Sequence, residues 1–311
     1  MSRKALIIGA AGMIGRKLVQ RLRKDAGYEL ILHDVVPFEG SSAVSDLSTP
    51  GEAEKLVAQR PDLIFHLAAI VSGEAEADFE KGYRINLDGT RRLFEAVRKV
   101  GDGYKPKLVF TSSIAVFGAP FPDAIGDEFL NAPLTSYGTQ KAIGELLLSD
   151  YSRRGFFDGI GIRLPTICVR PGKPNKAASG FFSGILREPL AGQEAVLPVP
   201  DTVRHWFASP RAAIEFLMHA AKLDTGLLGT RRNLSMPGLT ATIAEEIESL
   251  RRVGGDKAAR LIRREPDPTI MRIVEGWPRN FDARRALALG FRADPSFDDI
   301  VRFHVEDELS R

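Results

Sequence analysis

A tyrosine and a lysine stand four positions apart near the middle of the chain, at Tyr137 and Lys141. Four residues complete about one turn of an α-helix, so a helix would hold both side chains on one face. Free tyrosine has a pKa of about 10 and is a poor base at neutral pH, but a nearby ammonium favours the phenolate and lowers that pKa. Such a pair could accept the proton of an alcohol while hydride leaves the carbon. Taken alone, the pair is better explained as a surface tyrosine and a solvated lysine, and only further motifs in the chain favour the catalytic interpretation.

Three glycines, Gly9, Gly12 and Gly15, follow the first apolar run of the chain. Residues 5–9 have the pattern of a buried strand, and apolar residues at four-residue spacing after them predict a helix. A glycine-rich turn at this junction lets a pyrophosphate approach the backbone and the free amides of the helix N-terminus. The strand before and the helix after favour a dinucleotide site over an ordinary turn.

Acidic residues at the ends of the next two predicted strands bear on the choice of cofactor. Asp34 closes a strand predicted over 29–34 and could accept hydrogen bonds from adenosine ribose hydroxyls. It would repel a 2′-phosphate, so it favours NAD over NADP. Asp46 and Leu47 follow the third strand and are candidates for the adenine edge, although aspartate is common in loops.

Composition excludes several classes of protein. The 311 residues carry 43 basic and 40 acidic side chains, a net charge of only +3 without long basic blocks, so no nucleic-acid partner is indicated. The single cysteine, Cys168, excludes a disulfide framework and fits a reducing compartment. The five histidines show no metal-ligand spacing, so no metal is expected. No run approaches the roughly eighteen apolar residues of a membrane span, and the N-terminus lacks a signal-peptide pattern. We therefore expect a cytoplasmic protein.

The first half of the chain must form the strands and helices that position these residues. Apolar strands are predicted over 5–9, 29–34, 43–47, 62–68, 107–112 and 159–164. Helices are predicted after residue 12 and over 52–59, 75–99 and 136–154, and the helix over 75–99 could be interrupted near Gly82. Continuous apolar strands alternating with helices predict an α/β fold: a Rossmann-type, doubly wound parallel sheet covered on both faces.

Frequent prolines change the pattern after residue 165. Helices are expected over 176–187, 209–222, 240–252, 281–289 and after 296, with a strand over 230–236. We expect a smaller C-terminal substrate lobe over 166–204 and 237–311. The NAD-binding domain would then cover 1–165, with returning segments near 205–236.

The glycine spacing Gly-x-x-Gly-x-x-Gly, with Tyr-x-x-x-Lys downstream, resembles the short-chain dehydrogenase/reductase superfamily. Residues 113–118, Ser-Ile-Ala-Val-Phe-Gly, resemble its Ser-x-x-Val-Tyr-Gly segment, which implies that Ser113 is catalytic with Tyr137 and Lys141, and Ser112 is the alternative. The serine would orient the substrate oxygen, and the lysine would also hold the nicotinamide ribose. The resemblance implies that NAD contacts Gly9, Gly12, Met13, Ile14, Gly15, Asp34, Asp46, Leu47, Leu67, Ala68, Ala69, Asn86, Thr111, Tyr137, Lys141, Pro165 and Ile167.

Length and the extra C-terminal lobe resemble the extended branch of that superfamily, which includes nucleotide-sugar epimerases and dehydratases. The resemblance implies a homodimer formed through the helices predicted over 75–99 and 136–154. It also leaves open an epimerase or dehydratase that retains its NAD. A non-catalytic NAD-binding protein is a third possibility, which the complete Ser113, Tyr137 and Lys141 set disfavours.

Three stretches, residues 66–78, 137–147 and 163–179, are similar to the D-erythronate dehydrogenases, and the similarity runs along nearly the whole chain. It implies NAD-dependent oxidation of the C2 hydroxyl of a four-carbon sugar acid, D-erythronate to 2-keto-D-erythronate. In that family the reaction opens the catabolism of such sugar acids.

Basic residues near 170 offer partial, independent support for an anionic substrate. Arg170, Lys173 and Lys176 fall within seven residues and precede a predicted helix, a setting that suits a carboxylate. Each basic side chain equally fits a solvated charge, and His205 is expected to pack rather than to shuttle protons. The substrate candidates are Ser72, Gly73, Ser113, Thr166, Arg170, Lys173, Asn175 and Arg204.

Overall fold

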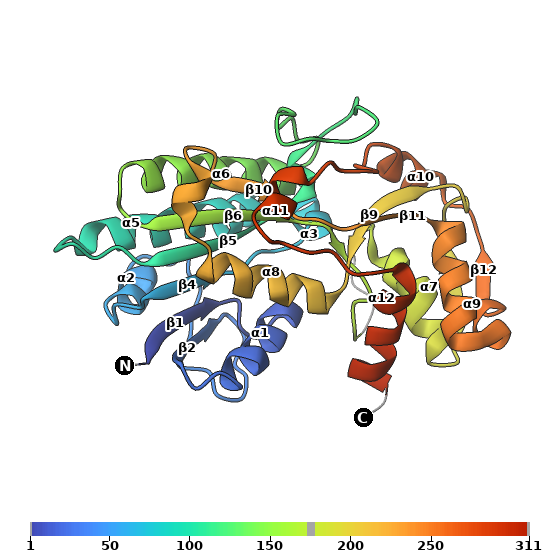
Figure 1. The fold of residues 1–311 in the computed structure, drawn as a ribbon, viewed down its shortest axis with the longest axis horizontal. Coiled ribbons are helices and arrows are strands. Elements are labelled where there is room, and N and C mark those ends of the chain that lie inside the picture. Colours follow the sequence, from blue (N-terminus) through green and yellow to red (C-terminus); the bar gives the residue numbers. More distant parts are fainter. Residues whose placement is uncertain (1, 173–177, 310–311) are drawn as a thin grey trace. The chain divides into compact units, whose positions relative to one another are not determined.

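The computed structural model describes residues 2–172 and 178–309, and the chain divides into two compact units (Figure 1). Unit 1 contains the chain up to Val116, Thr135–Arg163 and Ile214–Leu234. Unit 2 contains Phe117–Leu134, Leu164–Ala213 and the chain from Ser235 onward. Residues 117–134, 164–165, 205–213 and 235–236, which we expected in the first domain, lie in unit 2.

Unit 1 is built on a seven-stranded sheet in the order β10-β6-β5-β4-β1-β2-β3. Its strands are β1 (Arg3–Ile8), β2 (Tyr28–Asp34), β3 (Ala43–Val44), β4 (Leu63–His66), β5 (Lys107–Ser113), β6 (Asp158–Leu164) and β10 (Asn233–Ser235). The pairs β2–β3, β1–β2, β1–β4 and β4–β5 are parallel. The chain runs outward from β1 to β3 and then returns to β4 on the other side of β1. The predicted doubly wound α/β fold is confirmed, with its switch point between β1 and β4.

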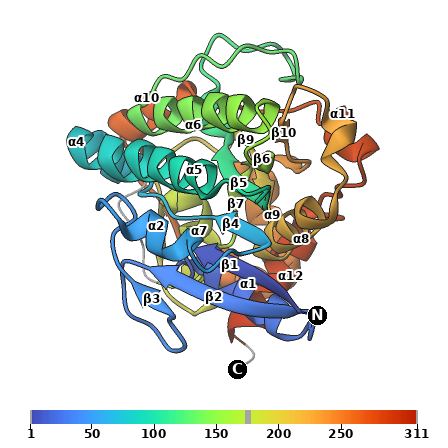
Figure 2. The ribbon, with the colours of Figure 1, turned by 90° about the vertical axis from the view of Figure 1, so that its left-hand side faces the viewer.

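Helices cover both faces of this sheet because its central strands are apolar on both sides. Residues Ala5 to Ile8 of β1 are completely buried. Figure 2 shows α5 and α6 side by side over one face, and the two helices are in contact. An ion pair between Arg21 and Glu215 joins α1 to α8. The helices are α1 (Met13–Arg23), α2 (Glu52–Val57), α5 (Gly89–Val100), α6 (Ser136–Arg153) and α8 (Pro210–Lys222), with 3-10 turns η2 (Ile114–Val116) and η3 (Thr225–Leu228).

The helix predicted over 75–99 is divided into several elements, and one boundary falls at Gly82, where the sequence allowed an interruption. The segment contains α3 (Ser72–Ala77), α4 (Phe79–Gly82), a π-helical turn η1 (Tyr83–Asp88) and then α5. The break falls at Asp78, whose side chain accepts a hydrogen bond from the Lys81 backbone and so caps α4. A cap of this kind starts a new helix without disturbing the apolar spacing from which the prediction was made.

Unit 2 contains a three-stranded sheet, β11-β9-β7, and a two-stranded sheet, β12-β8. The strands are β7 (Thr166–Ile167), β8 (Ala195–Leu197), β9 (Arg204–Ala208), β11 (Leu239–Thr242) and β12 (Ile262–Arg264). The helices are α7 (Gly180–Leu190), α9 (Ile243–Ala259), α10 (Pro268–Glu275), α11 (Arg284–Ala288), α12 (Phe297–His304) and the π-helical turn η4 (Val305–Leu309). The helix predicted over 240–252 begins only after Thr242, where Thr242 and Glu245 form a capping box.

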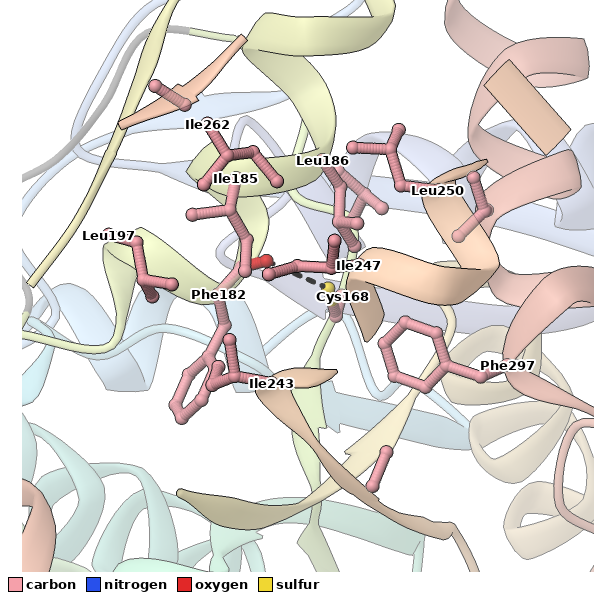
Figure 3. Packing of buried hydrophobic residues seen from close by; sticks show 14 of the residues in the cluster. Cys168, Phe182, Ile185, Leu186, Leu197, Ile243, Ile247, Leu250, Ile262 and Phe297 are labelled. Atoms are coloured by element: carbon pink, nitrogen blue, oxygen red, sulfur yellow. Dashed lines mark hydrogen bonds between the residues drawn. The ribbon is translucent and has the colours of Figure 1, made fainter. Parts of the chain in front are cut away.

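The core of unit 2 surrounds the single cysteine (Figure 3). Cys168 is completely buried with side chains of α7 and α9, and its thiol contacts the Phe182 carbonyl oxygen at 3.7 Å. Burial raises the pKa of this thiol well above its ordinary value. The thiol therefore stays protonated and serves as a packing group.

Glu246 of α9 is completely buried, and neither of its carboxyl oxygens has a hydrogen-bond partner among the described residues. Burial raises the pKa of this carboxyl well above its ordinary 4.5. Above that ordinary value the folded state holds a proton that the unfolded state releases, so this group lowers stability as pH rises. We expect Glu246→Met to raise the free energy of unfolding at pH 7 by about 1–3 kcal/mol.

Urea unfolding at pH 5 and pH 7.5 measures this effect. The free energy of unfolding of Glu246→Met should exceed that of the wild type by more at pH 7.5 than at pH 5. Glu248→Met on the exposed side of the same helix is the matched control and should change little. A Glu246→Met protein less stable than the wild type at both pH values would contradict the prediction.

Candidate active site

The glycine turn after β1 packs closely against neighbouring backbone just before α1 begins. Gly9 has a φ of +94°, and a Cβ there would lie 2.7 Å from the Ala68 backbone nitrogen. A Cβ at Gly15 would overlap the carbonyl oxygen of Gly9. The Leu67 and Ala68 amides both donate to the Ile8 carbonyl oxygen at 2.9 Å, so the segment after β4 lies beside the glycine turn. The turn, with its bare backbone and helix N-terminus, fits a dinucleotide pyrophosphate.

Asp34 faces this turn, as the sequence predicts. Its Oδ2 accepts a hydrogen bond from the Ala11 backbone nitrogen at 2.8 Å, and its Oδ1 accepts one from Val36 at 3.2 Å. A carboxylate at the end of β2 and against the glycine turn stands where ribose hydroxyls would reach it. Met13 and Ile14 begin α1 directly behind the turn.

Asp46 belongs to a small polar cluster. One of its oxygens accepts from the backbone nitrogen and the hydroxyl of Ser48, and the other accepts from the Arg84 guanidinium. These hydrogen bonds hold the pKa of Asp46 below its ordinary value even though partial burial opposes them. The cluster keeps the carboxylate charged, while the neighbouring Leu47 is buried.

Tyr137 and Lys141 both lie on α6, one turn apart. The Lys141 ammonium lies 5.8 Å from the Tyr137 ring centroid and donates to the Thr111 carbonyl oxygen at 2.8 Å. Burial lowers the pKa of Lys141 to about 8, and the charge of Glu145 opposes that shift. At pH 7 the lysine is therefore mainly cationic, the state that favours a phenolate nearby.

The two serines at the end of β5 have different surroundings. Ser112 is 3% exposed and donates its hydroxyl to Glu145 Oε1 at 2.6 Å. Ser113 is partly exposed, and its oxygen accepts from the Ala115 backbone nitrogen at 3.1 Å. Acceptance of that bond leaves the Ser113 hydrogen available, whereas the Ser112 hydrogen is already donated.

Sequence reasoning missed a buried ion pair behind these residues. Arg163 of β6 donates to both oxygens of Glu145, at 2.8 and 2.7 Å. Glu145 is 1% exposed and Arg163 is 7% exposed. The only sequence signal is that Tyr137, Lys141 and Glu145 repeat every four residues along α6.

Asn86 and Thr111 lie close to these groups, but their side chains bond to protein atoms. Asn86 bonds to the backbone of Ile70 through both its oxygen and its nitrogen, and Thr111 donates to the His66 carbonyl oxygen at 3.0 Å. His66, at the end of β4, is also buried, and burial lowers its pKa to about 3, so the ring is neutral. Ala69 follows in the same segment, and Ser72 and Gly73 begin α3.

Five other predicted site residues belong to unit 2. Thr166 bonds the His205 ring at 2.6 Å, and that ring stacks on Phe182 at 4.9 Å between centroids. Burial lowers the pKa of His205 to about 4, so it packs as a neutral ring. The other four are Pro165 and Ile167, both buried, the half-buried Arg170, and the exposed Arg204, which lies 3.7 Å from Glu245. Lys173, Asn175 and Lys176 lie outside the described residues.

No group of three or more His, Cys, Asp or Glu side chains within 2–172 and 178–309 is arranged to hold a metal ion. The same described ranges contain no helix long and apolar enough to cross a membrane.

A doubly wound sheet, a glycine turn at its switch point and a Tyr-Lys pair on one helix define a nicotinamide-dependent oxidoreductase of the Rossmann type. The chain belongs to the NAD dependent epimerase/dehydratase family, whose model matches residues 5–210. The resemblance to the extended short-chain dehydrogenases is thereby confirmed.

Several relatives span nearly the whole chain. D-erythronate dehydrogenase of Cupriavidus necator is 48% identical over 97% of this chain and 98% of its own. The Haemophilus influenzae enzyme of the same name is 40% identical over 98% of this chain and 100% of its own. A crystal structure described as the nucleoside-diphosphate-sugar epimerase of Agrobacterium tumefaciens is 66% identical and covers 99% of this chain and 95% of that chain, with a TM-score of 0.95.

Proposed function

We propose that this protein is a D-erythronate dehydrogenase that uses NAD to oxidise the C2 hydroxyl of its substrate to a ketone. The observation that carries the proposal is the near-complete match to two proteins of that name, at 48% and 40% identity. The Tyr137–Lys141 pair on α6 supplies the chemistry that such an oxidation needs.

The proposed roles follow from the geometry of unit 1. Tyr137 accepts the proton of the C2 hydroxyl, and the Lys141 ammonium stabilises its phenolate. Ser113 donates its hydrogen to the substrate oxygen and orients it, and the bond that Ser112 donates to Glu145 favours Ser113 for this role. NAD, when bound, supplies the acceptor for the hydride that leaves C2. The sequence, rather than this geometry, offers cationic partners for the substrate carboxylate, and Arg170 and Arg204 are the candidates among the described residues.

An absorbance assay for NADH tests the proposal directly. The wild-type protein mixed with NAD and D-erythronate should produce NADH, with L-threonine and a UDP-hexose as comparison substrates. Production of 2-keto-D-erythronate in step with NADH would establish the reaction. Absence of NADH, together with turnover of the UDP-hexose, would overturn the proposal that the protein is a D-erythronate dehydrogenase.

The preference for NAD is assigned to Asp34. We expect Asp34→Ala to weaken NAD binding by roughly 10- to 100-fold, because two charge-assisted ribose hydrogen bonds are lost. NADP binding should change less, so discrimination between the two cofactors narrows. Titration calorimetry with both cofactors measures the effect, and Asp25→Ala, which removes a carboxylate from the turn before β2, is the control. An unchanged NAD to NADP ratio would place Asp34 away from the ribose.

A cavity in unit 2 favours a second candidate function, epimerisation or dehydration of a nucleotide sugar with retained NAD. The cavity has a volume of about 590 Å³ and is lined by Arg204, Thr240, Arg279 and Asn280 together with residues 119–123. This volume exceeds what a four-carbon acid fills and falls in the usual range of ligand sites. NAD that stays bound through purification, and exchange of label within a UDP-hexose, would support this alternative.

We further propose a cytoplasmic homodimer. The single buried cysteine fits a reducing compartment. Leu146 on α6 and Phe79 on α4 are 70% and 60% exposed, which gives these helices apolar groups for a second copy of the chain to cover. Light scattering after size exclusion should give about twice the mass of the chain.

A further inference from the structure

Buried hydrogen bonds link five elements of unit 1 into a chain that ends at Lys141. The Thr90 hydroxyl donates to the Asn86 carbonyl oxygen at 2.7 Å and accepts from the His66 ring at 2.8 Å. The His66 carbonyl oxygen accepts from the Thr111 hydroxyl at 3.0 Å. The Thr111 carbonyl oxygen in turn accepts from the Lys141 ammonium at 2.8 Å. The path runs from η1 through α5, β4 and β5 to α6.

Gln140, the residue next to Lys141, closes this path into a ring. It is completely buried, and its Oε1 accepts a hydrogen bond from Asn86 Nδ2 at 2.7 Å. The Ile70 backbone holds the Asn86 amide in one orientation, with Ile70 N donating to Oδ1 at 2.9 Å and Nδ2 donating to Ile70 O at 3.1 Å. Because Asn86 must therefore present its nitrogen, Gln140 must present its oxygen. The segment after β4 thus dictates the conformation of a side chain on α6.

The absence of a side chain at Gly82 leaves room for the Gln140 amide. A Cβ at Gly82 would lie 2.7 Å from Gln140 Nε2 and 3.2 Å from the Ala75 side chain. Gln140 Nε2 itself has no hydrogen-bond partner within the part of the chain that the structure describes. An unpartnered buried amide lowers stability, but an apolar residue at this position would leave one hydrogen of Asn86 Nδ2 without its acceptor. The two effects oppose each other, so the main contribution of Gln140 is the orientation that its oxygen fixes.

We propose that Gln140 is a positioning residue for catalysis. Through Asn86 it holds α6, and with it Tyr137 and Lys141, in fixed register with the segment after β4, which would face the cofactor. This inference rests on the proposed function for the roles of Tyr137 and Lys141. A base displaced by about 1 Å costs of order 10²-fold in rate, so a hydrogen bond that prevents such a displacement has a large kinetic effect.

The test replaces Gln140 with methionine, which has a similar length and no acceptor oxygen. We expect a melting temperature close to the wild-type value, because one unpartnered polar group replaces another, and a kcat lowered roughly 10- to 100-fold. KM for the sugar acid should stay within about threefold of the wild-type value. Hydrogen exchange of the apo protein should accelerate in peptides covering residues 67–75, since the Ile70 amide loses its fixed acceptor. Gln140→Glu keeps an acceptor oxygen and should restore that protection at pH values at which its buried carboxyl is protonated.

Two further variants separate positioning from stability. Gly82→Ala pushes the Gln140 amide without altering it and should lower kcat and speed exchange at 67–75. Asn233→Leu removes side-chain hydrogen bonds, to Glu145 O and Ser149 Oγ, from the other end of α6. It should lower the melting temperature and leave kcat within about twofold.

Wild-type kcat and wild-type exchange in Gln140→Met would overturn the proposal, as would a loss of kcat that follows melting temperature across all variants. If the wild-type protein oxidises no sugar acid, the proposed function fails. The exchange measurement on apo protein then still decides whether Gln140 holds residues 67–75.

Discussion

Replacing Tyr137 with phenylalanine is expected to lower kcat for D-erythronate oxidation by roughly 10²- to 10⁴-fold. The substitution removes the phenolic oxygen that accepts the substrate proton and leaves the ring in place beside Lys141. The Lys141 ammonium keeps its bond to the Thr111 carbonyl oxygen, so NAD affinity should stay within about threefold. Initial rates of NADH formation and calorimetric NAD titrations measure the two quantities separately.

The same substitution elsewhere on α6 provides the control. Tyr151 bonds to Glu95 through its hydroxyl, and Tyr151→Phe removes that contact without touching the site. It should cost about 1 kcal/mol of stability and preserve kcat within about twofold. Wild-type rates in the Tyr137→Phe protein would mean that another group is the base.

The Arg163→Met substitution is expected to lower the free energy of unfolding by about 3–5 kcal/mol, because it leaves the buried Glu145 carboxylate without its cation. Charge, not side-chain volume, dominates this loss. The double variant Arg163→Met with Glu145→Gln should therefore recover more than half of it, since the glutamine is neutral and still accepts from Ser112. Urea unfolding of the two variants and the wild type gives the three free energies.

An exposed ion pair on α6 provides the control for the buried pair. Arg153 and Asp150 are paired at 2.6 Å with side chains 63% and 57% exposed. Solvent screens such a pair, so Arg153→Met should change stability by less than about 0.5 kcal/mol. Equal losses at Arg153 and Arg163 would show that burial does not set the strength of the internal pair.

The parts of the site that follow from local spacing could be predicted from the sequence. The glycine turn is specified by a strand, three glycines and a helix within about twenty residues, and Asp34 by the end of the following strand. Tyr137 and Lys141 share a face because any α-helix places residues four apart on one side. The structure places these residues at the predicted elements.

The missed parts depend on contacts between distant segments. Glu145 and Arg163 are paired only because α6 packs against β6 in one register, and Asn86 reaches Gln140 across 54 positions. The π-helical turn that carries Asn86 leaves no mark in apolar spacing. Strands such as β7, only two residues long, contain too few positions for alternation to be recognised.

The division of the chain between the two units has a consequence for how the protein folds in the cell. The chain passes from one unit to the other after residues 116, 134, 163, 213 and 234. During synthesis, unit 1 lacks β10 until residues 233–235 have left the ribosome, and unit 2 lacks α9 for longer still. Neither unit can complete its core while the chain is still short. The glycine turn and the first strands are therefore synthesised before the later segments that pack against them. Folding is therefore expected to finish after synthesis, and a fragment that ends near residue 165 should populate an incomplete, aggregation-prone state.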